Sequence, residues 1–399
     1  MHFGVGVVKK EYDPVSGEEK VVPKTKKRRT DGYFDYSLLF VWIFVMLLGY
    51  VLLYSASSYT ALNKYNDSAY FLKKQLQATA LGCVVMIPAV MIDYRFWRKF
   101  NKLIYFGAIG TVLLVVTPLG VEANGARRWV DLKVLQFQPA ELVKIAVIIM
   151  TAHMLAKCGS TALKHGKICW QIYSVSILGG ALLFLLTSNL SSALIVLGIG
   201  AIMIMIAGAG KYFTGVIMGG LALGTVSLFF LGEFSNLGFR FSRIAVWRNP
   251  EAYMDGTGYQ VMQGLYAIGS GGLFGKGLGQ SAQKLGFVPE ATNDMIFSII
   301  CEELGIFGAV CIIALFIFML RRMRVIASNA TDLFGSMIVV GVLAHISLQV
   351  VLNIAVVTNF IPNTGVSLPF ISYGGTSLLF LMLEMGLVLS VSKRIKRIR

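Results

Sequence analysis

Long uncharged apolar segments recur along the whole chain and are separated by short polar stretches. A helix needs about 20 apolar residues to cross roughly 30 Å of hydrocarbon, and ten segments come close to that length. We predict membrane-spanning helices near residues 36–54, 76–92, 103–120, 140–157, 168–187, 192–209, 212–231, 294–320, 336–357 and 376–391. The predicted fold class is therefore all-α, a polytopic membrane protein with ten transmembrane helices.

Composition supports this architecture, and the distribution of charge indicates its orientation in the membrane. Hydrophobic residues make up 56% of the chain and charged residues 14%, whereas about a quarter of a soluble domain is charged. Lys and Arg concentrate in cytoplasmic loops. One set of alternate loops and tails carries 24 of them and the other carries 11. We therefore expect a protein of the cytoplasmic membrane with both termini in the cytoplasm.

The same assignment divides the chain into regions. Residues 1–32 mix Lys, Glu, Pro and Gly without apolar periodicity, so we expect a disordered basic tail. Residues 33–395 would form the transmembrane domain, with a large extracellular loop at about 232–293, and residues 393–399 a second basic tail. The net charge of +16 lies mostly beside predicted spans. Anionic membrane lipids explain it better than nucleic acid does.

A glycine-rich run precedes the eighth predicted span. Seven of the sixteen residues from Gly264 to Gly279 are glycine. Each glycine costs roughly 1 kcal/mol in a helix interior, so we predict a loop over this run. The loop leads to Asp294 at the mouth of the next span, on the predicted outer side.

Asp294 heads a polar column on that helix. Asp294, Ser298 and Glu302 are spaced at i, i+4 and i+8, which places them on one side. Glu302 would lie roughly 12 Å deeper than Asp294. Asp294 could cap the helix or accept a proton from a hydroxyl group, and the local sequence leaves both roles open.

Two more sets of polar residues lie inside predicted spans, where ionisable groups are costly and often functional. Glu141 and Lys144, three residues apart, share a helix face and can neutralise each other. His345, Gln349 and Asn353 follow one another at spacing four and form a polar stripe. Hydrogen bonds between helices explain the stripe more simply than substrate contact does. Glu384 in the last span is interpreted in the same way.

Cations on the predicted outer side suit an anionic group, since Arg offers a planar fork and Lys a point charge. The candidates are Arg127, Arg128, Arg240, Arg243, Arg248, Lys276 and Lys284. Of these we prefer Arg127, Arg128 and Lys276. The five cysteines and four histidines show no spacing typical of a zinc site.

Five ordered blocks make the chain resemble a known family over residues 33–395. They are YSASS with YFLKKQ, NGARRWV with FQPAELVK, GYQVMQGLYAIGSGGLFGKGLGQS, VPEATNDMIFSIICEELG and NTGVSLPFISYGGTSLL. The chain resembles the SEDS family, which includes the division protein FtsW, the elongation protein RodA and the sporulation protein SpoVE. Two of these blocks are more similar to the FtsW and SpoVE branch than to RodA.

The resemblance implies a ten-helix peptidoglycan glycosyltransferase. Such an enzyme polymerises lipid II at the outer face of the cytoplasmic membrane during cell division, together with a class B penicillin-binding transpeptidase and other divisome proteins. It also implies that Asp294 is the essential acidic residue and that Glu141 and Lys144 form the charged pair of the fourth helix. Relatives commonly carry a His shortly before the acidic residue, and this chain has Ala291, Thr292 and Asn293 there.

Our hypothesis is that Asp294 is the general base, with Arg127, Arg128, Lys276, Gln260 and Gln263 binding substrate. Ser298, Glu302, His345, Gln349 and Asn353 would support the site. Asp294 as ligand of a divalent cation, Mg²⁺ or Mn²⁺, is an alternative. Rival functions are a lipid II flippase, a scaffold for the transpeptidase, and an elongation- or sporulation-specific polymerase.

Overall fold

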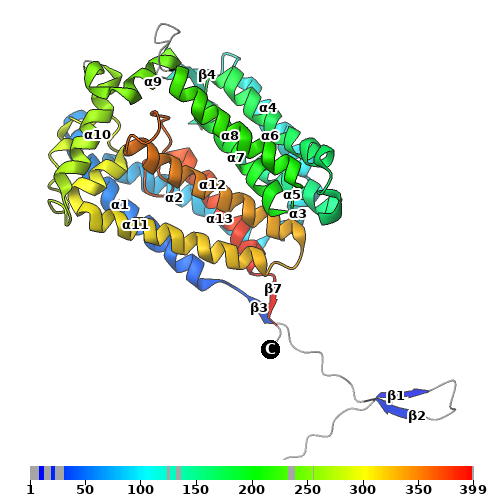
Figure 1. The fold of residues 1–399 in the computed structure, drawn as a ribbon. Helices are drawn as coiled ribbons and strands as arrows, with labels where there is room; N and C mark the ends of the chain where they lie inside the picture. Colours follow the sequence, from blue (N-terminus) through cyan, green and yellow to red (C-terminus); the bar gives the residue numbers. More distant parts are fainter. Residues whose placement is uncertain are drawn as a thin grey trace, which may run out of the picture.

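The computed structural model describes residues 9–12, 19–22, 31–123, 126–131, 136–231, 239–254 and 256–397. Helices dominate this part of the chain (Figure 1). The ten apolar helices are α1 Tyr36–Tyr65, α2 Tyr70–Met91, α4 Asn101–Leu114, α5 Pro139–Ala162, α6 Gly166–Thr187, α7 Leu190–Ile206, α8 Lys211–Leu231, α11 Ile296–Ser328, α12 Leu333–Val357 and α13 Gly375–Ser392. Each of them corresponds to one predicted span, so the all-α membrane fold is confirmed.

Within the described residues, seven of these helices are long and apolar enough to cross a membrane by length and composition. The other three, α4, α7 and α8, form a class of shorter apolar helices. The count of ten spans is therefore approximate when length is the criterion. Aspartate side chains cap the start of α1 and of α12: Asp35 accepts a hydrogen bond from Leu38 N, and Asp332 accepts one from Gly335 N.

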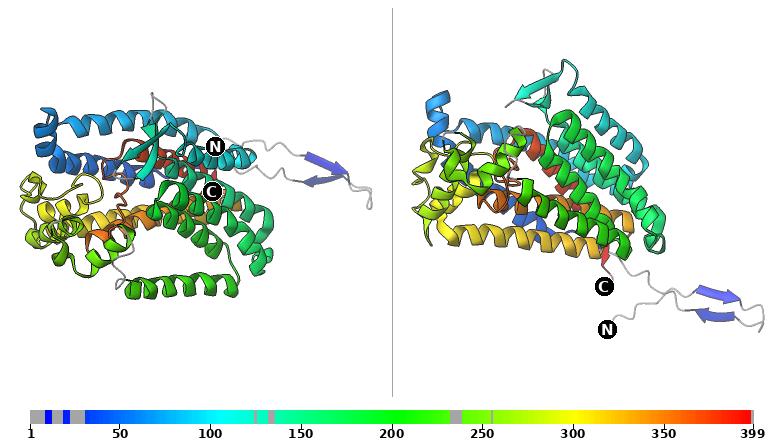
Figure 2. Two further views of the ribbon diagram at one scale, coloured as in Figure 1. Left: turned by 90° about the horizontal axis from the view of Figure 1, so that it is seen from above. Right: turned by 45° about the horizontal axis from the view of Figure 1, so that its top comes forward.

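Helix α12 is central to the bundle. It packs against α5 and α7 on one side and against α11 and α13 on the other. Helices α4 and α6 extend the first group, whereas α1 and α10 (Thr257–Gly271) pack on α11 (Figure 2). The polar stripe predicted for residues 345–353 therefore faces protein, and lipid does not reach it.

Short strands form three small sheets in the described chain. Strands β4 (Gly120–Ala123), β5 (Ala126–Asp131) and β6 (Gln136–Phe137) make an antiparallel sheet in the loop before α5. Strands β1 (Lys9–Tyr12) and β2 (Glu19–Val22) pair within the predicted tail, and the remaining residues of 1–30 lie outside the described chain. Strand β3 (Asp31–Tyr33) pairs antiparallel with β7 (Ile395–Arg397), which brings the two ends of the membrane domain together.

The predicted loop at 232–293 is largely helical where it is described. It contains α9 (Phe239–Arg248), α10 and two 3-10 segments, Pro250–Tyr253 and Gln283–Leu285, whereas residues 232–238 and 255 lie outside the described chain. The prediction of a loop from Gly264 onward was wrong at its start, because α10 continues to Gly271. Packing of α10 against α11 outweighs the low helix propensity of glycine. A short helix, α3 (Tyr94–Lys99), was not predicted either.

Candidate functional site

Asp294 lies in the turn that precedes α11. The N-cap of this helix is Met295, and no side chain in the described part of the chain caps it. The structure therefore contradicts the capping role for Asp294. Asn353 of α12 holds the turn in place, because its Nδ2 donates to the backbone oxygens of Asp294 (2.8 Å) and Val366 (2.7 Å).

A chain of polar contacts reaches the Asp294 carboxylate from α9 and α10. Gln260 Nε2 lies 3.4 and 3.5 Å from the two carboxylate oxygens. Asn363 Nδ2 donates to Gln260 Oε1 at 3.1 Å, which fixes the orientation of the amide. Arg243 donates to the backbone oxygen of Asn363 at 3.2 Å. Elements far apart in sequence thus converge on one carboxylate.

The surroundings of Asp294 make it a stronger base than an ordinary aspartate. Its side chain is largely buried, with 8% of the residue exposed. The pKa of Asp294 is raised to about 6, mainly by burial and also by the charge of Glu290, while the Gln260 hydrogen bond and the Arg243 charge act in the opposite direction. A carboxyl group with a pKa near 6 is ionised at neutral pH and can still take up a proton in a reaction.

A small polar hollow of about 60 Å³ lies beside Gln260. Its lining residues are Arg243, Val246, Trp247, Gln260, Val261, Asn359 and Asn363. Trp247 Nε1 donates to the backbone oxygen of Asn359, which joins α9 to the loop after α12. The hollow therefore places a guanidinium group and amide groups next to the side chain that contacts Asp294.

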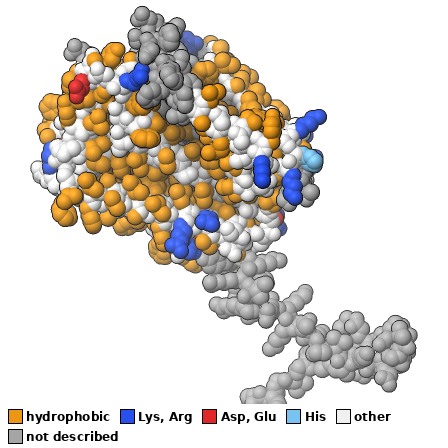
Figure 3. Space-filling model, viewed as in Figure 1, with side chains coloured by type: hydrophobic (Ala, Val, Ile, Leu, Met, Phe, Trp, Pro, Cys, Tyr) orange, Lys and Arg blue, Asp and Glu red, His pale blue; other side chains and the backbone are white. Residues whose placement is uncertain are grey.

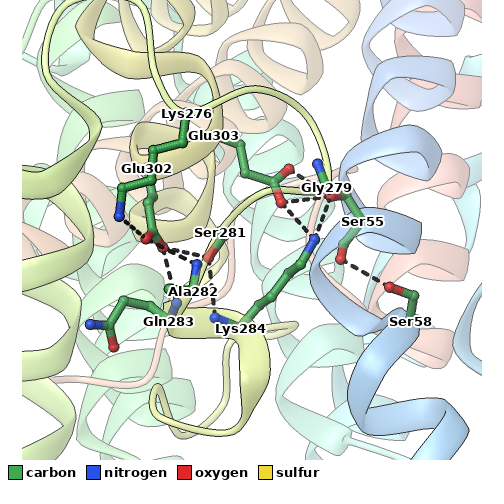
Figure 4. Close-up of polar contacts among 10 residues, drawn as sticks. All are labelled: Ser55, Ser58, Lys276, Gly279, Ser281, Ala282, Gln283, Lys284, Glu302 and Glu303. Carbon is green, nitrogen blue, oxygen red and sulfur yellow. Dashed lines mark hydrogen bonds and ion pairs between the residues drawn. The ribbon is translucent and has the colours of Figure 1, made fainter.

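The polar column predicted on α11 leads away from Asp294 to a second cluster (Figure 4). Ser298 is fully buried beside Gly264 of α10. Glu302 is also fully buried and accepts hydrogen bonds from Lys276 Nζ (2.7 Å), from Ser281 Oγ and from the backbone N–H of Ala282 (3.2 Å). The column thus fastens the glycine-rich loop to α11, and Asp294 stands at its far end.

Glu303 forms the matching contact on the opposite side of α11. Its carboxylate accepts hydrogen bonds from Ser55 Oγ of α1 (2.7 Å) and from Lys284 Nζ (2.9 Å). The backbone N–H of Gly279 donates to Ser55 Oγ at 3.1 Å. Two adjacent buried carboxylates therefore clamp both ends of the loop, as Figure 4 shows.

A buried charged group connects α5, α12 and α13. Lys144 Nζ lies 2.7 Å from Glu141 Oε1 and 3.1 Å from His345 Nε2, and His345 Nδ1 lies 2.8 Å from Glu384 Oε2. The pair Glu141 and Lys144 is therefore present. His345 and Glu384 extend it into a group of four, a connection that the separate sequence positions did not indicate. Gln349 lies between this group and Asn353 on α12, and it is also buried.

The predicted cations and amides occupy different places. Arg127 is exposed on β5 and Arg128 is half-buried beside it, whereas Asn124 and Gly125 of the same motif lie outside the described chain. Lys276 is bound to Glu302, which reduces its freedom to bind substrate. Gln260 contacts Asp294, and Gln263 lies three residues further along α10. Asn363 was missed as a site residue, although it belongs to the block NTGVSLPFISYGG.

Among the residues that the structure describes, no group of three or more His, Cys, Asp or Glu side chains could hold a metal ion. Asp294 has one neighbouring carboxylate, Glu290, whose charge raises its pKa. Mg²⁺ is commonly bound by one or two carboxylates together with substrate phosphates. The residues present fit that arrangement, in which the phosphates would supply the other ligands.

Comparisons with known proteins agree with this architecture. The family of cell cycle proteins FtsW, RodA and SpoVE matches residues 35–397. Stage V sporulation protein E of Bacillus subtilis is 36% identical and covers 90% of this chain and 97% of its own. The probable peptidoglycan glycosyltransferase FtsW of Geobacter metallireducens is 37% identical and covers 91% and 96%.

A solved structure extends the similarity to three dimensions. A chain of a peptidoglycan synthase complex, studied for its coordination of polymerization and crosslinking, superimposes with a TM-score of 0.71. It is 26% identical to this chain, and the match covers 90% of this chain and 97% of that one.

Proposed function

The chain belongs to the family of cell cycle proteins FtsW, RodA and SpoVE, and from this premise we propose that it polymerises lipid II into glycan strands, with Asp294 as general base. The chain is a peptidoglycan glycosyltransferase of this family and a multi-pass membrane protein.

In the proposed reaction, Asp294 accepts the proton of the sugar 4-hydroxyl of one lipid II molecule. The hydroxyl oxygen attacks the anomeric carbon of the growing strand, and the bond from that carbon to the pyrophosphate breaks with inversion. Undecaprenyl pyrophosphate leaves with the electron pair of the broken bond. The single observation that carries the assignment is a buried carboxylate that Gln260 contacts, in a turn held by the bond from Asn353 to the Asp294 backbone oxygen, with its pKa raised to about 6.

Cations must stabilise the pyrophosphate as it leaves. Arg127, Arg128 and Lys276 remain our predicted contacts, and the geometry adds Arg243, which lines the small polar hollow and whose charge acts on Asp294. Arg243 suits this role because a guanidinium can hold two phosphate oxygens at once. A divalent cation would be held by Asp294 together with the phosphates, and would neutralise part of the same charge.

The decisive experiment compares Asp294→Asn with Glu290→Gln, a matched change four residues away on an exposed side chain. Each purified full-length protein is reconstituted with labelled lipid II, with and without a class B penicillin-binding transpeptidase. We expect polymer from wild type and from Glu290→Gln, and a loss of at least about 100-fold in Asp294→Asn, in line with loss of a general base. Polymer formation by Asp294→Asn at the wild-type rate would disprove the base assignment.

The same reconstitution in lipid vesicles distinguishes the rival functions. Movement of lipid II between leaflets without polymer would indicate a flippase, and neither activity would indicate a scaffold. Titration of Mg²⁺ and Mn²⁺ separates the role of general base from that of metal ligand, because a ligand role predicts that Asp294→Asn raises the cation concentration needed for half-maximal rate.

We assign the protein to septal synthesis with divisome partners, and depletion of the protein should then block division before it changes cell width.

A further inference from the structure

The glycine-rich loop after α10 is hydrogen-bonded to a break in α11. Gly305 has φ 67° and ψ −169°, so the helix is interrupted there. The loop supplies hydrogen-bond partners for backbone groups of α11 around the break. The bonds run from Lys276 N to Glu302 O (2.9 Å), Gly277 N to Glu303 O (2.9 Å), Ile306 N to Gly272 O (3.0 Å) and Phe307 N to Leu273 O (3.0 Å). These four bonds pair four backbone groups of the loop with four of α11.

This contact requires glycine at particular positions. A Cβ on Gly271 would lie 1.9 Å from the backbone oxygen of Cys301, and one on Gly275 would lie 2.2 Å from that of Glu303. A Cβ on Gly305 would lie 2.4 Å from the backbone nitrogen of Gly275. The glycines therefore serve close backbone packing between the loop and α11.

The break occurs at one end of the long uncharged part of α11. Residues 304–320 carry no charge and are bounded by Glu303 and by Arg321. Seventeen helical residues extend about 26 Å, close to the roughly 30 Å of a bilayer core. Phe307, one turn inside this stretch, is 64% exposed, as expected for a side chain that faces lipid. Hydrophobic side chains likewise dominate the face shown in Figure 3.

The tip of the loop continues this lipid-facing surface. Leu273 is 67% exposed and Phe274 is 80% exposed. The rings of Phe274 and Phe307 lie 6.3 Å apart, so the two side chains belong to one apolar surface. Leu278 adds a third exposed apolar side chain. Glu302 and Glu303 are buried; Glu302 pairs with Lys276, whose side chain is 37% exposed, and Glu303 pairs with the buried Lys284.

From these observations we propose that residues 272–278 form a membrane-inserted loop, in which Leu273 and Phe274 contact the acyl chains of phospholipids in the leaflet on the Asp294 side. Irregular backbone enters hydrocarbon only where its polar groups find partners within the protein, and the bonds to α11 supply such partners for Gly272, Leu273, Lys276 and Gly277. An apolar surface of this kind on a protein marks a site of contact with lipid or protein. Because the loop tip is continuous with the exposed apolar side chains of α11, we favour contact with lipid over contact with protein.

Site-directed spin labelling of the full-length protein in phospholipid nanodiscs tests this proposal. Single cysteines replace Phe274, Phe307 or Glu290 in a chain where Cys83, Cys158 and Cys311 are alanine. The buried Cys169 and Cys301 remain, and the parent chain is checked for absence of label. Relaxation by oxygen, which partitions into lipid, is compared with relaxation by a water-soluble nickel chelate.

Phe307→Cys provides the lipid reference and Glu290→Cys the water reference. We expect the ratio of oxygen to nickel accessibility at Phe274→Cys to lie nearer to the Phe307 value, and at least about fivefold above the Glu290 value. A ratio nearer to that of Glu290 would overturn the proposal. Low accessibility to both reagents would mean that another protein chain covers the loop, and would also reject the lipid assignment. The test needs no catalytic activity, so it is independent of the proposed reaction.

Discussion

At the scale of single residues, Asp294 is a buried carboxylate, and burying its charge lowers the free energy of unfolding. Its pKa rises from the ordinary 3.8 to about 6 on folding, so the folded state binds the proton more tightly than the unfolded state. The ionised carboxylate therefore destabilises the fold at pH values above the folded pKa, by up to roughly 3 kcal/mol. Below the unfolded pKa this cost is absent.

Replacement of Asp294 by Asn should remove that cost. We expect Asp294→Asn to have a higher apparent melting temperature than wild type at pH 7.5, and the difference should shrink as pH falls through about 6. Thermal unfolding of both proteins in one detergent at pH 7.5 and 5 measures this. A variant less stable than wild type at pH 7.5 would show that the ionised carboxylate stabilises the fold.

The proton of Asp294 should also govern the pH dependence of polymerisation. A base must be ionised, so we expect the rate to fall about tenfold per pH unit below a pKa near 6. The Gln260 hydrogen bond lowers the pKa of Asp294, so Gln260→Ala should move the acid limb to higher pH. Gln263→Ala, three residues along α10, serves as the control and should leave the limb in place, whatever its effect on KM.

At the scale of elements, apolar length predicted the helices because burial in lipid depends on local composition alone. The contacts of the loop after α10 could not be predicted in this way. The sequence shows Lys276 and Lys284 only as flanking cations, but in the fold each pairs with a buried carboxylate of α11. Asn363 was missed for the same reason, since its role arises from contact between the loop after α12 and Gln260 of α10.

The clamp between Lys284 and Glu303 should contribute strongly to stability, because both side chains are buried. Lys284→Met leaves the carboxylate without its cation, which we expect to cost about 3–5 kcal/mol. The double variant Lys284→Met with Glu303→Gln should recover part of the loss. Lys73→Met, which breaks the exposed pair with Asp67, is the control and should not change the apparent melting temperature. Equal effects of the two single changes would contradict the role of the clamp.

At the scale of the whole molecule, the pairing of β3 with β7 constrains the membrane topology. The chain enters α1 and leaves α13 at the same place, and Arg322 at the end of α11 also bonds Asp35 there (2.6 Å). Two ends on one side require an even number of crossings. The seven helices that meet the length and composition criterion within the described residues would alone give an odd number, whereas the ten apolar helices satisfy the constraint. An odd number of the remaining helices α4, α7 and α8 must therefore cross as well, and ten crossings result when all three do.

This topology predicts which cysteines a membrane-impermeant maleimide can reach. The excess of Lys and Arg on the side of the termini indicates the cytoplasm, and Asp294 lies at the other end of α11. With Cys83, Cys158 and Cys311 replaced by alanine, Glu290→Cys should be labelled in intact spheroplasts, whereas Lys393→Cys should be labelled only after permeabilisation. Both side chains are exposed, so accessibility on their own side is not limiting. Labelling of Lys393→Cys in intact spheroplasts would place the termini outside and Asp294 inside, on the wrong face for polymerisation at the outer surface.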